Sequence, residues 1–197
     1  MTFDQSYFDD LYRDNPDPWD FRSSEYEKNK YAATLAALPR EHYVHALELG
    51  CSIGELTCQL ASRADEVTGV DTSTIALDVA RAACQHANHV TFVQAHLPGG
   101  DWDRPADLVL LSEILYYLDA PSVRELARRI ARSAPGADMV LVHWTGATNY
   151  PLTGDVAADT FIAEFSTADV KTYRAPHYRL DVITARTSVK NAVQPGD

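Results

Sequence analysis

The chain has 197 residues, 46% of them hydrophobic, and a formal net charge of −11 from 28 acidic residues against 17 Lys and Arg. This length suits one domain with one hydrophobic core. The negative charge excludes binding to nucleic acids or anionic membranes through bulk charge. No secretory signal peptide is apparent, and no apolar run approaches the ~18 residues of a membrane span.

The first 22 residues are rich in aromatic and acidic side chains. Pro16 and Pro18 predict that no regular helix forms there, because proline lacks a backbone N–H and restricts the residue before it. Ser24 and Glu27 then form a capping-box pattern, which predicts the start of an amphipathic helix. We expect the first segment to form an aromatic lid that orders on ligand binding; the alternative is that its rings only pack onto the core.

The rest of the chain alternates short apolar runs with helical patterns. Strands are predicted at 44–49, 66–70, 90–94, 107–111, 139–143, 170–173 and 178–184. The alternation implies a parallel sheet with right-handed crossovers. Only four residues separate the last two runs, too few for a crossover helix, so these two strands must form an antiparallel hairpin.

This pattern predicts one domain over residues 1–186. Residues 1–38 would supply the lid and first helix, and residues 39–186 a Rossmann-like core. Residues 187–197 have no apolar periodicity and are expected to form a disordered tail.

A glycine turn follows the first predicted strand, in the sequence Glu-Leu-Gly-Cys-Ser-Ile-Gly at 48–54. We expect Gly50 and Gly54 to remove side chains where a ligand approaches the backbone, and the helix start to offer free N–H groups. Asp71 ends the next strand, 17 residues after Gly54, and can accept both hydroxyls of a ribose. Together these features predict an adenosine-containing cofactor.

The type of cofactor depends on the spacing of the glycines. A dinucleotide site would have G-x-G-x-x-G, but Ser52 stands at the middle glycine. The pattern E-x-G-x-x-x-G resembles the first motif of class I S-adenosylmethionine-dependent methyltransferases. The resemblance implies S-adenosylmethionine as cofactor and S-adenosylhomocysteine as product. It also implies an α/β fold, a Rossmann-like doubly wound sheet of about seven strands, mostly parallel with one antiparallel strand at the C-terminal end. The alternatives are a turn that serves only packing and a nicotinamide-dependent enzyme.

Ligands of open α/β sheets bind beyond the carboxyl ends of the strands, so position along the chain predicts the cofactor-binding residues. By the resemblance, the segment after the third strand holds the adenine, with His96 as a second contact or as a plain loop histidine. The ring of Trp19 could face the sulfonium, and Arg22 could meet the cofactor's carboxylate. The full set of candidates is Trp19, Arg22, Glu48, Gly50, Cys51, Ser52, Gly54, Asp71, Thr72, His96, Leu97 and Ser112.

Glu113 is the first candidate for a catalytic role. It follows an apolar strand by two positions, where burial would raise the pKa of an unpartnered carboxyl group. It could accept a proton or hold an ammonium group; the alternative is a carboxylate that only stabilises a helix start. His143 is a second candidate base, with a structural histidine as the alternative, and Tyr117 is a candidate helper. His42 and His45, and His86 and His89, have ligand-like spacing, but no carboxylate or cysteine completes a site, so no metal is predicted.

Five blocks make the resemblance specific to one family of these methyltransferases, at 17–22, 24–30, 48–54, 112–118 and 178–182. In these blocks the chain is similar to the rhizobial nodulation N-methyltransferases of the NodS family. That family is understood to methylate the free amine of the non-reducing glucosamine in a de-N-acetylated chitooligosaccharide, during nodulation factor biosynthesis. The resemblance implies that reaction and a small oligosaccharide as the partner. The rival interpretations are a small-molecule O- or S-methyltransferase and a non-catalytic cofactor-binding domain.

The three cysteines are Cys51, Cys58 and Cys84, and they show no C-x-x-C pairing. Three cysteines in a chain of this size suggest buried thiols in a reducing compartment. We therefore expect a cytoplasmic protein that binds neither nucleic acid nor membrane. The sequence leaves the oligomeric state open, with a monomer as the simplest expectation.

Overall fold

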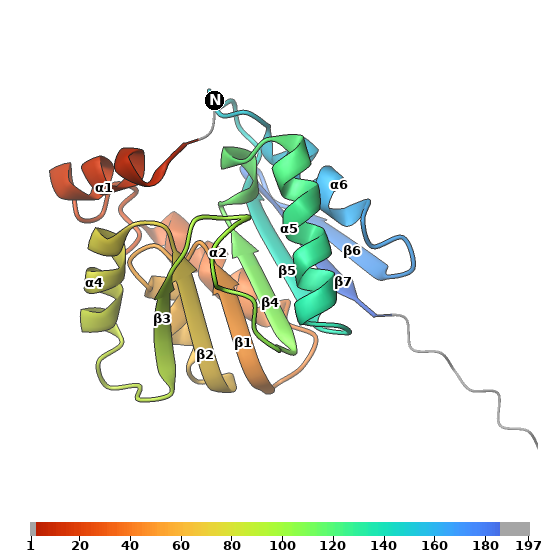
Figure 1. Cartoon of the computed structure of the whole chain (residues 1–197), viewed down its shortest axis with the longest axis horizontal. Helices are drawn as coiled ribbons and strands as arrows, with labels where there is room; N and C mark the ends of the chain where they lie inside the picture. Colours follow the sequence, from red (N-terminus) through yellow and green to blue (C-terminus); the bar gives the residue numbers. More distant parts are fainter. Residues whose placement is uncertain (1–2, 186–197) are drawn as a thin grey trace, which may run out of the picture.

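A seven-stranded sheet forms the centre of the protein in the computed structural model, which describes residues 3–185 (Figure 1). The strands are β1 (Tyr43–Leu49), β2 (Ala64–Asp71), β3 (Val90–Gln94), β4 (Leu108–Ser112), β5 (Asp138–Trp144), β6 (Asp169–Arg174) and β7 (Tyr178–Thr184). The helices are α1 (Gln5–Asp14), α2 (Glu25–Ala36), α3 (Glu55–Leu60), α4 (Thr74–Ala83), the short 3-10 helix η1 (Leu115–Tyr117), α5 (Ala120–Ser133) and α6 (Gly154–Ile162). Every predicted strand is present, with its ends within two residues of the prediction.

The strand order is β3-β2-β1-β4-β5-β7-β6. Neighbouring strands from β3 to β5 are parallel, and β7 pairs antiparallel with both β5 and β6. The mostly parallel sheet with one reversed C-terminal strand is therefore confirmed. The reversed strand lies between β5 and β6 because the hairpin folds back into the sheet.

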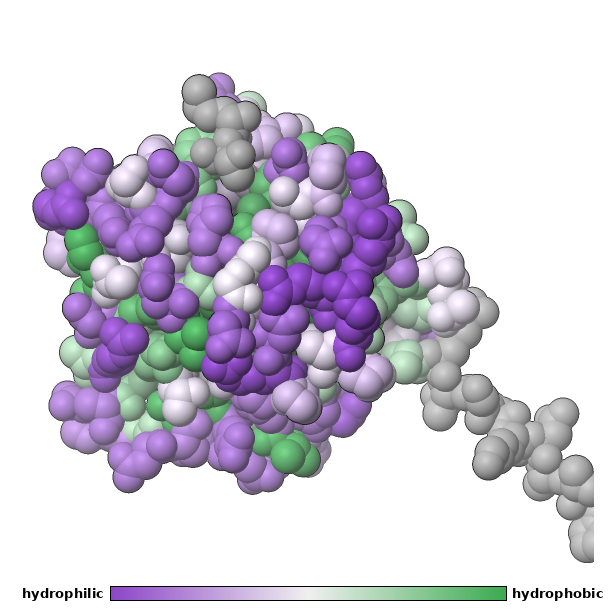
Figure 2. Space-filling model, viewed as in Figure 1, coloured by the Kyte–Doolittle hydropathy of each residue, from purple (hydrophilic) through white to green (hydrophobic). Residues whose placement is uncertain are grey.

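Helices cover both faces of the sheet, so alternate residues of the central strands are buried on opposite sides. Leu47 and Leu111 belong to the cluster that contains the apolar faces of α5 and α6. Leu108 and Leu110 belong to the cluster that contains α2 and α3 residues. Figure 2 views the molecule from the α5 side and shows strongly hydrophilic residues over this helix, which is rich in arginine. This burial on both sides explains the continuous apolar run of β4.

The N-terminal segment differs from the prediction, because α1 is a regular helix of 10 residues. It begins after Asp4, whose side chain accepts the backbone N–H of Tyr7, and it ends before Pro16. The prolines therefore limit where this helix ends and do not prevent it from forming. The Ser73 hydroxyl donates to Asp9 over 2.6 Å and links α1 to the start of α4.

The cysteine prediction is wrong for two of the three residues. Cys58 of α3 and Cys84 at the end of α4 form a disulfide, with their Cα atoms 5.4 Å apart. Cys51 is a buried free thiol. The sequence shows no spacing signal for the bond, because packing of α3 beside α4 brings residues 26 positions apart together.

The helix that begins after Ser24 is confirmed as α2, and the Ser24 side chain accepts the N–H of Glu27. Within residues 3–185, every helix is too short or too polar to cross a lipid bilayer. The predicted tail at 187–197 lies outside the described residues.

Candidate functional site

A cavity of about 460 Å³ lies beyond the carboxyl ends of the strands, under α1 and the start of α2. Its walls come from the turn after β1 and from the segments that follow β2, β3, β4 and β5. The lining includes ten of the predicted residues: Trp19, Gly50, Ser52, Asp71, Thr72, His96, Leu97, Ser112, Glu113 and Tyr117. The position rule for open α/β sheets therefore locates most of the predicted site.

Gly50 and Gly54 have different roles in the turn. Both adopt a left-handed backbone with a φ of 81°, which favours glycine. A Cβ on Gly50, which lines the cavity, would lie 2.6 Å from the Ile114 side chain. A Cβ on Gly54 would lie 2.8 Å from Ala80 of α4, and Gly54 does not line the cavity. Gly54 thus allows α3 to pack on α4, and its expected role in ligand approach stays a prediction.

Ser52 connects the turn to two other elements. Its φ is 50°, which is uncommon for a residue other than glycine. Its backbone N–H donates to Asp71 over 2.8 Å, and its hydroxyl hydrogen-bonds to the hydroxyl of buried Tyr12 in α1. The side chain at the middle-glycine position therefore ties α1 to the turn.

Asp71 lies at the end of β2 with both carboxylate oxygens accepting backbone N–H groups. Oδ2 accepts from Ser52 and Oδ1 accepts from Ser73 over 2.9 Å. Burial raises the pKa of Asp71, and these N–H groups oppose that effect. A carboxylate has about four acceptor sites, so it retains capacity for further donors such as ribose hydroxyls. The remaining acceptor capacity of the Asp71 carboxylate fits the predicted adenosine cofactor.

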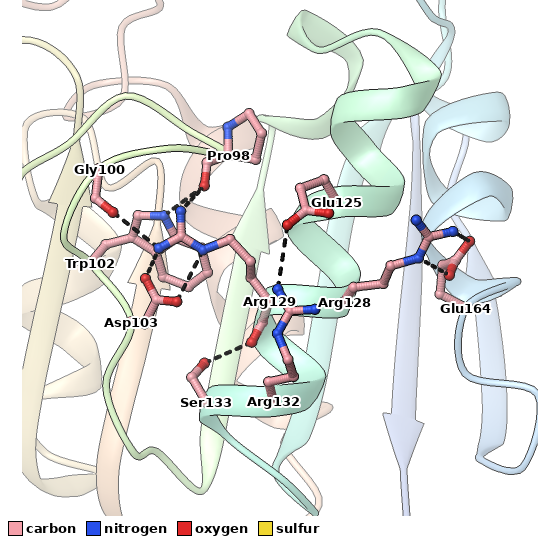
Figure 3. A network of polar contacts seen from close by, with 10 residues as sticks. All are labelled: Pro98, Gly100, Trp102, Asp103, Glu125, Arg128, Arg129, Arg132, Ser133 and Glu164. Atoms are coloured by element: carbon pink, nitrogen blue, oxygen red, sulfur yellow. Dashed lines mark hydrogen bonds and ion pairs between the residues drawn. The ribbon is translucent and has the colours of Figure 1, made fainter.

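The segment after β3 forms the wall beside Asp71 and Thr72, through Ala95, His96 and Leu97. His96 Nδ1 lies 3.2 Å from the Thr72 hydroxyl, so both predicted residues come together there. Arg129 of α5 holds the loop that follows this wall, and we call its contacts there the clamp (Figure 3).

Arg129 of α5 is the centre of that clamp. Its guanidinium pairs with Asp103, donates to the carbonyl oxygens of Pro98 and Gly100, and lies 4.6 Å from the ring of buried Trp102 (Figure 3). The neighbouring arginines of α5 pair instead with glutamates on the surface, Arg128 with Glu164 and Arg132 with Glu125. Sequence reasoning missed this contact because Arg129 resembles any other arginine on an amphipathic helix.

At the other end of the cavity, Glu113 has a left-handed backbone with a φ of 57°. Its Oε1 accepts from Lys30 Nζ over 2.7 Å, and its Oε2 accepts the hydroxyl of Tyr116 and the backbone N–H of Trp144, each over 2.8 Å. Three of about four acceptor sites are thus filled, and one remains for a further donor.

Lys30 lies in the block 24–30 that carries the resemblance, but it is not among the predicted site residues. It is only 2% exposed, and its Nζ lies between Glu113 and Glu27, 2.9 Å from the Glu27 carboxylate. The Nζ also lies 5.2 Å from the centre of the Tyr26 ring. Burial raises the pKa of Glu27, and Lys30 opposes that effect. In the sequence, the i,i+3 spacing of Glu27 and Lys30 is typical of an exposed helix pair, so it gives no signal of burial.

The two other predicted catalytic residues occupy different surroundings. His143 is fully buried and does not line the cavity. Its Nε2 accepts the N–H of Leu115 over 3.2 Å, and burial lowers its pKa to about 4. Tyr117 does line the cavity, where its ring lies 4.4 Å from Tyr150.

Aromatic rings from the N-terminal segment form part of the cavity wall. Phe3 contacts Tyr117 and Tyr150 with ring centres 5.7 and 5.4 Å apart, and Phe8 contacts Tyr117 at 5.2 Å. Trp19 lies against Tyr12. The predicted lid therefore covers the site through ring contacts and the Tyr12–Ser52 hydrogen bond.

Four predicted cofactor residues do not line this cavity. Arg22 pairs with Glu55 over 2.9 Å, and Gly54 packs on α4. Glu48 and Cys51 line a smaller cavity of about 30 Å³ behind the turn. Glu48 accepts the Thr57 hydroxyl, and burial raises its pKa to about 8.

Within the part of the chain that the structure describes, no three His, Cys, Asp or Glu side chains come together in a way that could hold a metal ion.

Comparison with known families gives a match over residues 7–132, to the family described as Nodulation protein S (NodS). Nodulation protein S of Rhizobium tropici is 29% identical over 127 residues, which cover 63% of this chain and 53% of that protein. The alignments with several such proteins show that the chain spans about half the length of the curated relatives it matches.

Two solved structures show where the fold recurs. A methyltransferase-type structure from Pseudomonas syringae is 33% identical, with a TM-score of 0.71, covering 82% of this chain and 99% of that one. N-methyltransferase NodS from Bradyrhizobium japonicum WM9, in complex with S-adenosyl-L-homocysteine, is 18% identical with a TM-score of 0.74, covering 93% of this chain and 100% of that one. The chain therefore has the α/β fold of these methyltransferases.

Proposed function

Because the chain belongs to the NodS family, we propose that it is an S-adenosylmethionine-dependent N-methyltransferase. Its acceptor would be the free amine of the non-reducing glucosamine in a de-N-acetylated chitooligosaccharide, for nodulation factor biosynthesis. The observation that carries this proposal is Glu113 in the cavity lining, where three of its roughly four acceptor sites are filled and one remains.

The residues around the glycine turn fit S-adenosylmethionine. Asp71 would accept the ribose hydroxyls, Gly50 would allow close approach, and the wall of Ala95, His96 and Leu97 would hold the adenine. When bound there, the cofactor supplies an electrophilic methyl group. Trp19 lies in the cavity wall and could face the sulfonium; the role proposed for Arg22 would require it to leave Glu55.

The chain's own contribution to the reaction is to orient the amine and exclude water. Glu113 would accept an N–H of the amine and then collect the proton that the nitrogen loses after methylation. A sugar amine should lose its proton more readily than lysine, whose reference pKa is about 10.4, because electron-withdrawing oxygens surround it. Tyr117 could contact the acceptor directly, whereas His143 could act only through the peptide N–H that it accepts.

The charges of the lining argue against an acceptor that carries a phosphate. Of the described residues that line the cavity, Lys30 alone is Lys or Arg, and two carboxylates already hold its ammonium group. A phosphate there would lack a free cation and would face Glu113 and Glu27. A neutral sugar with one amine meets neither obstacle.

The remaining parts of the proposal concern partners and location. We infer a small oligosaccharide as the partner, no nucleic acid and no membrane, and a monomer in the cytoplasm. The Cys58–Cys84 disulfide is the observation that speaks against a reducing compartment. Counting free thiols in protein extracted under alkylating conditions would decide the location.

An acceptor panel tests the proposal. Purified protein with labelled S-adenosylmethionine should transfer one methyl group to a de-N-acetylated chitooligosaccharide, detected by mass, and none to the fully acetylated sugar. Turnover only of hydroxyl or thiol acceptors would support an O- or S-methyltransferase instead. Cofactor binding without turnover of any acceptor would support a non-catalytic domain.

A further inference from the structure

Lys30 brings an ammonium group into a site that should also receive the acceptor amine. Its ammonium lies 2.7 Å from Glu113 and 2.9 Å from Glu27, and 5.2 Å from the centre of the Tyr26 ring. Two carboxylates and an aromatic face are the groups that would bind a substrate ammonium. Lys30 therefore fills the position that would otherwise attract the acceptor in its protonated form.

The groups around this cluster come from several elements. The Tyr116 hydroxyl donates to Glu113 from η1, and β5 contributes His143. Farther charges and hydroxyls that act on the cluster are Asp17 on Glu27, Tyr178 on Tyr26, and Arg179 on His143. Burial holds His143 neutral, since its pKa is lowered to about 4, so the cluster itself consists of one cation and two anions.

The net charge of the cluster should decide how the acceptor binds. With Lys30 the cluster carries one negative charge, and without it the two carboxylates would carry a larger negative charge, of up to two. A more negative site favours an ammonium over a neutral amine, but only the neutral amine has the lone pair that attacks the methyl group. A site with no negative charge would fail to stabilise the positive charge that methylation leaves on nitrogen.

We propose that Lys30 sets the charge of the acceptor site, so that the acceptor amine binds in its neutral, nucleophilic form. Lys30 is a positioning residue in this scheme, because it acts through Glu113 and touches no reacting atom. The proposal rests on the proposed N-methyltransferase function and adds the group that controls protonation of its substrate.

The wild type and three variants, which together give the cluster three different charges, test the proposal. Lys30→Met gives up to two negative charges, the wild type and the double variant Lys30→Met/Glu27→Gln give one, and Glu27→Gln alone gives none. The pH at which kcat at saturating acceptor rises should be about one unit higher in Lys30→Met and about one unit lower in Glu27→Gln, since each change alters one unit charge beside the bound amine. In the double variant, the pH at which the rate rises should return close to its wild-type value. Lys28→Met is the matched control, because Lys28 pairs with Glu25 on the exposed side of α2.

A binding experiment gives the same comparison without turnover. Calorimetry of glucosamine oligomer binding to the S-adenosylhomocysteine complex, between pH 7 and 10, should show that Lys30→Met prefers the ammonium and Glu27→Gln the free amine. If Lys30→Met does not fold, the shift in Glu27→Gln and the return in the double variant remain decisive. Identical pH profiles in all folded variants would overturn the proposal. A wild type that methylates no amine would instead contradict the proposed function.

Discussion

The backbone N–H of Ser52 donates to the carboxylate of Asp71 over 2.8 Å, so the turn after β1 and the end of β2 form one unit. This link makes Asp71 both a part of the turn and the expected ribose acceptor. Asp71→Ala should weaken S-adenosylmethionine binding by about 2–3 kcal/mol, because two charge-assisted hydrogen bonds are lost. Calorimetry checks this value, with Asp78→Ala on the exposed side of α4 as the control. Unchanged affinity in a folded Asp71 variant would remove this residue from the site.

Glu113→Gln should lower kcat by ~10²-fold, the usual scale for one acid–base group. Cofactor affinity should stay near the wild-type value, because the carboxylate faces the acceptor end of the cavity. The pH dependence of the rate should follow the acceptor amine in both proteins, because only the neutral amine attacks the methyl group. Steady-state kinetics at saturating acceptor between pH 6 and 9 measures both effects. A variant within threefold of wild type would falsify the catalytic role and leave Glu113 as a structural partner of Lys30.

Arg129→Met should lower affinity for S-adenosylhomocysteine by about tenfold, or about 1.4 kcal/mol, although Arg129 does not line the cavity. The clamp on Pro98, Gly100 and Asp103 is lost, so the adenine wall is no longer held. Arg128→Met and Arg132→Met are the matched controls on the same helix and should bind normally.

Discrimination between bases separates this role of Arg129 from general destabilisation. The preference for S-adenosylhomocysteine over its inosine analogue should fall in Arg129→Met, because a displaced wall would distinguish the two bases less well. A loss of affinity that is equal for both ligands would contradict the adenine-wall role.

Glu48→Gln should raise the free energy of unfolding at neutral and alkaline pH by about 1–4 kcal/mol. Burial raises the pKa of Glu48 to about 8 in the folded state, against 4.5 as its ordinary value. The folded state therefore holds the proton more tightly, so this group contributes most stability below about pH 4.5 and loses it as the pH rises to about 8. Glutamine removes the charge but still accepts the Thr57 hydroxyl. Urea unfolding at pH 5 and pH 8 should show a gain that grows with pH; a gain independent of pH would contradict the titration.

Residues 3–22 should exchange their amide hydrogens faster without S-adenosylhomocysteine than with it. Two polar links, Tyr12–Ser52 and Ser73–Asp9, hold α1 over the cavity beside its ring contacts. Tyr12→Phe should increase exchange in α1 and leave α2 unchanged. Equal exchange with and without ligand would show that this segment is a fixed part of the core.

The backbone features that the sequence encodes locally could be predicted. The capping pattern at Ser24 predicted the start of α2, and the apolar run at 107–111 predicted the strand β4. Asp71 could be found because a strand end fixes both its position and its direction.

The site features that depend on long-range contacts could not be predicted. Lys30 and Glu113 are 83 residues apart, and nothing near either residue indicates the other. His143 follows the strand-end rule in sequence, yet its side chain is buried inside the fold under Leu115. Position along a strand gives the edge of the sheet, whereas packing decides which side chains reach the cavity.

The Cys58–Cys84 bond closes a loop that contains all of β2 and therefore Asp71. In the unfolded chain this loop of 26 residues stays closed, which lowers the entropy gained on unfolding and stabilises the fold by about 3 kcal/mol in the loop-entropy account. A protease that cuts once between α3 and α4 would leave both fragments covalently joined. On a non-reducing gel the nicked protein would still run as one chain, and it would separate into two bands only after reduction.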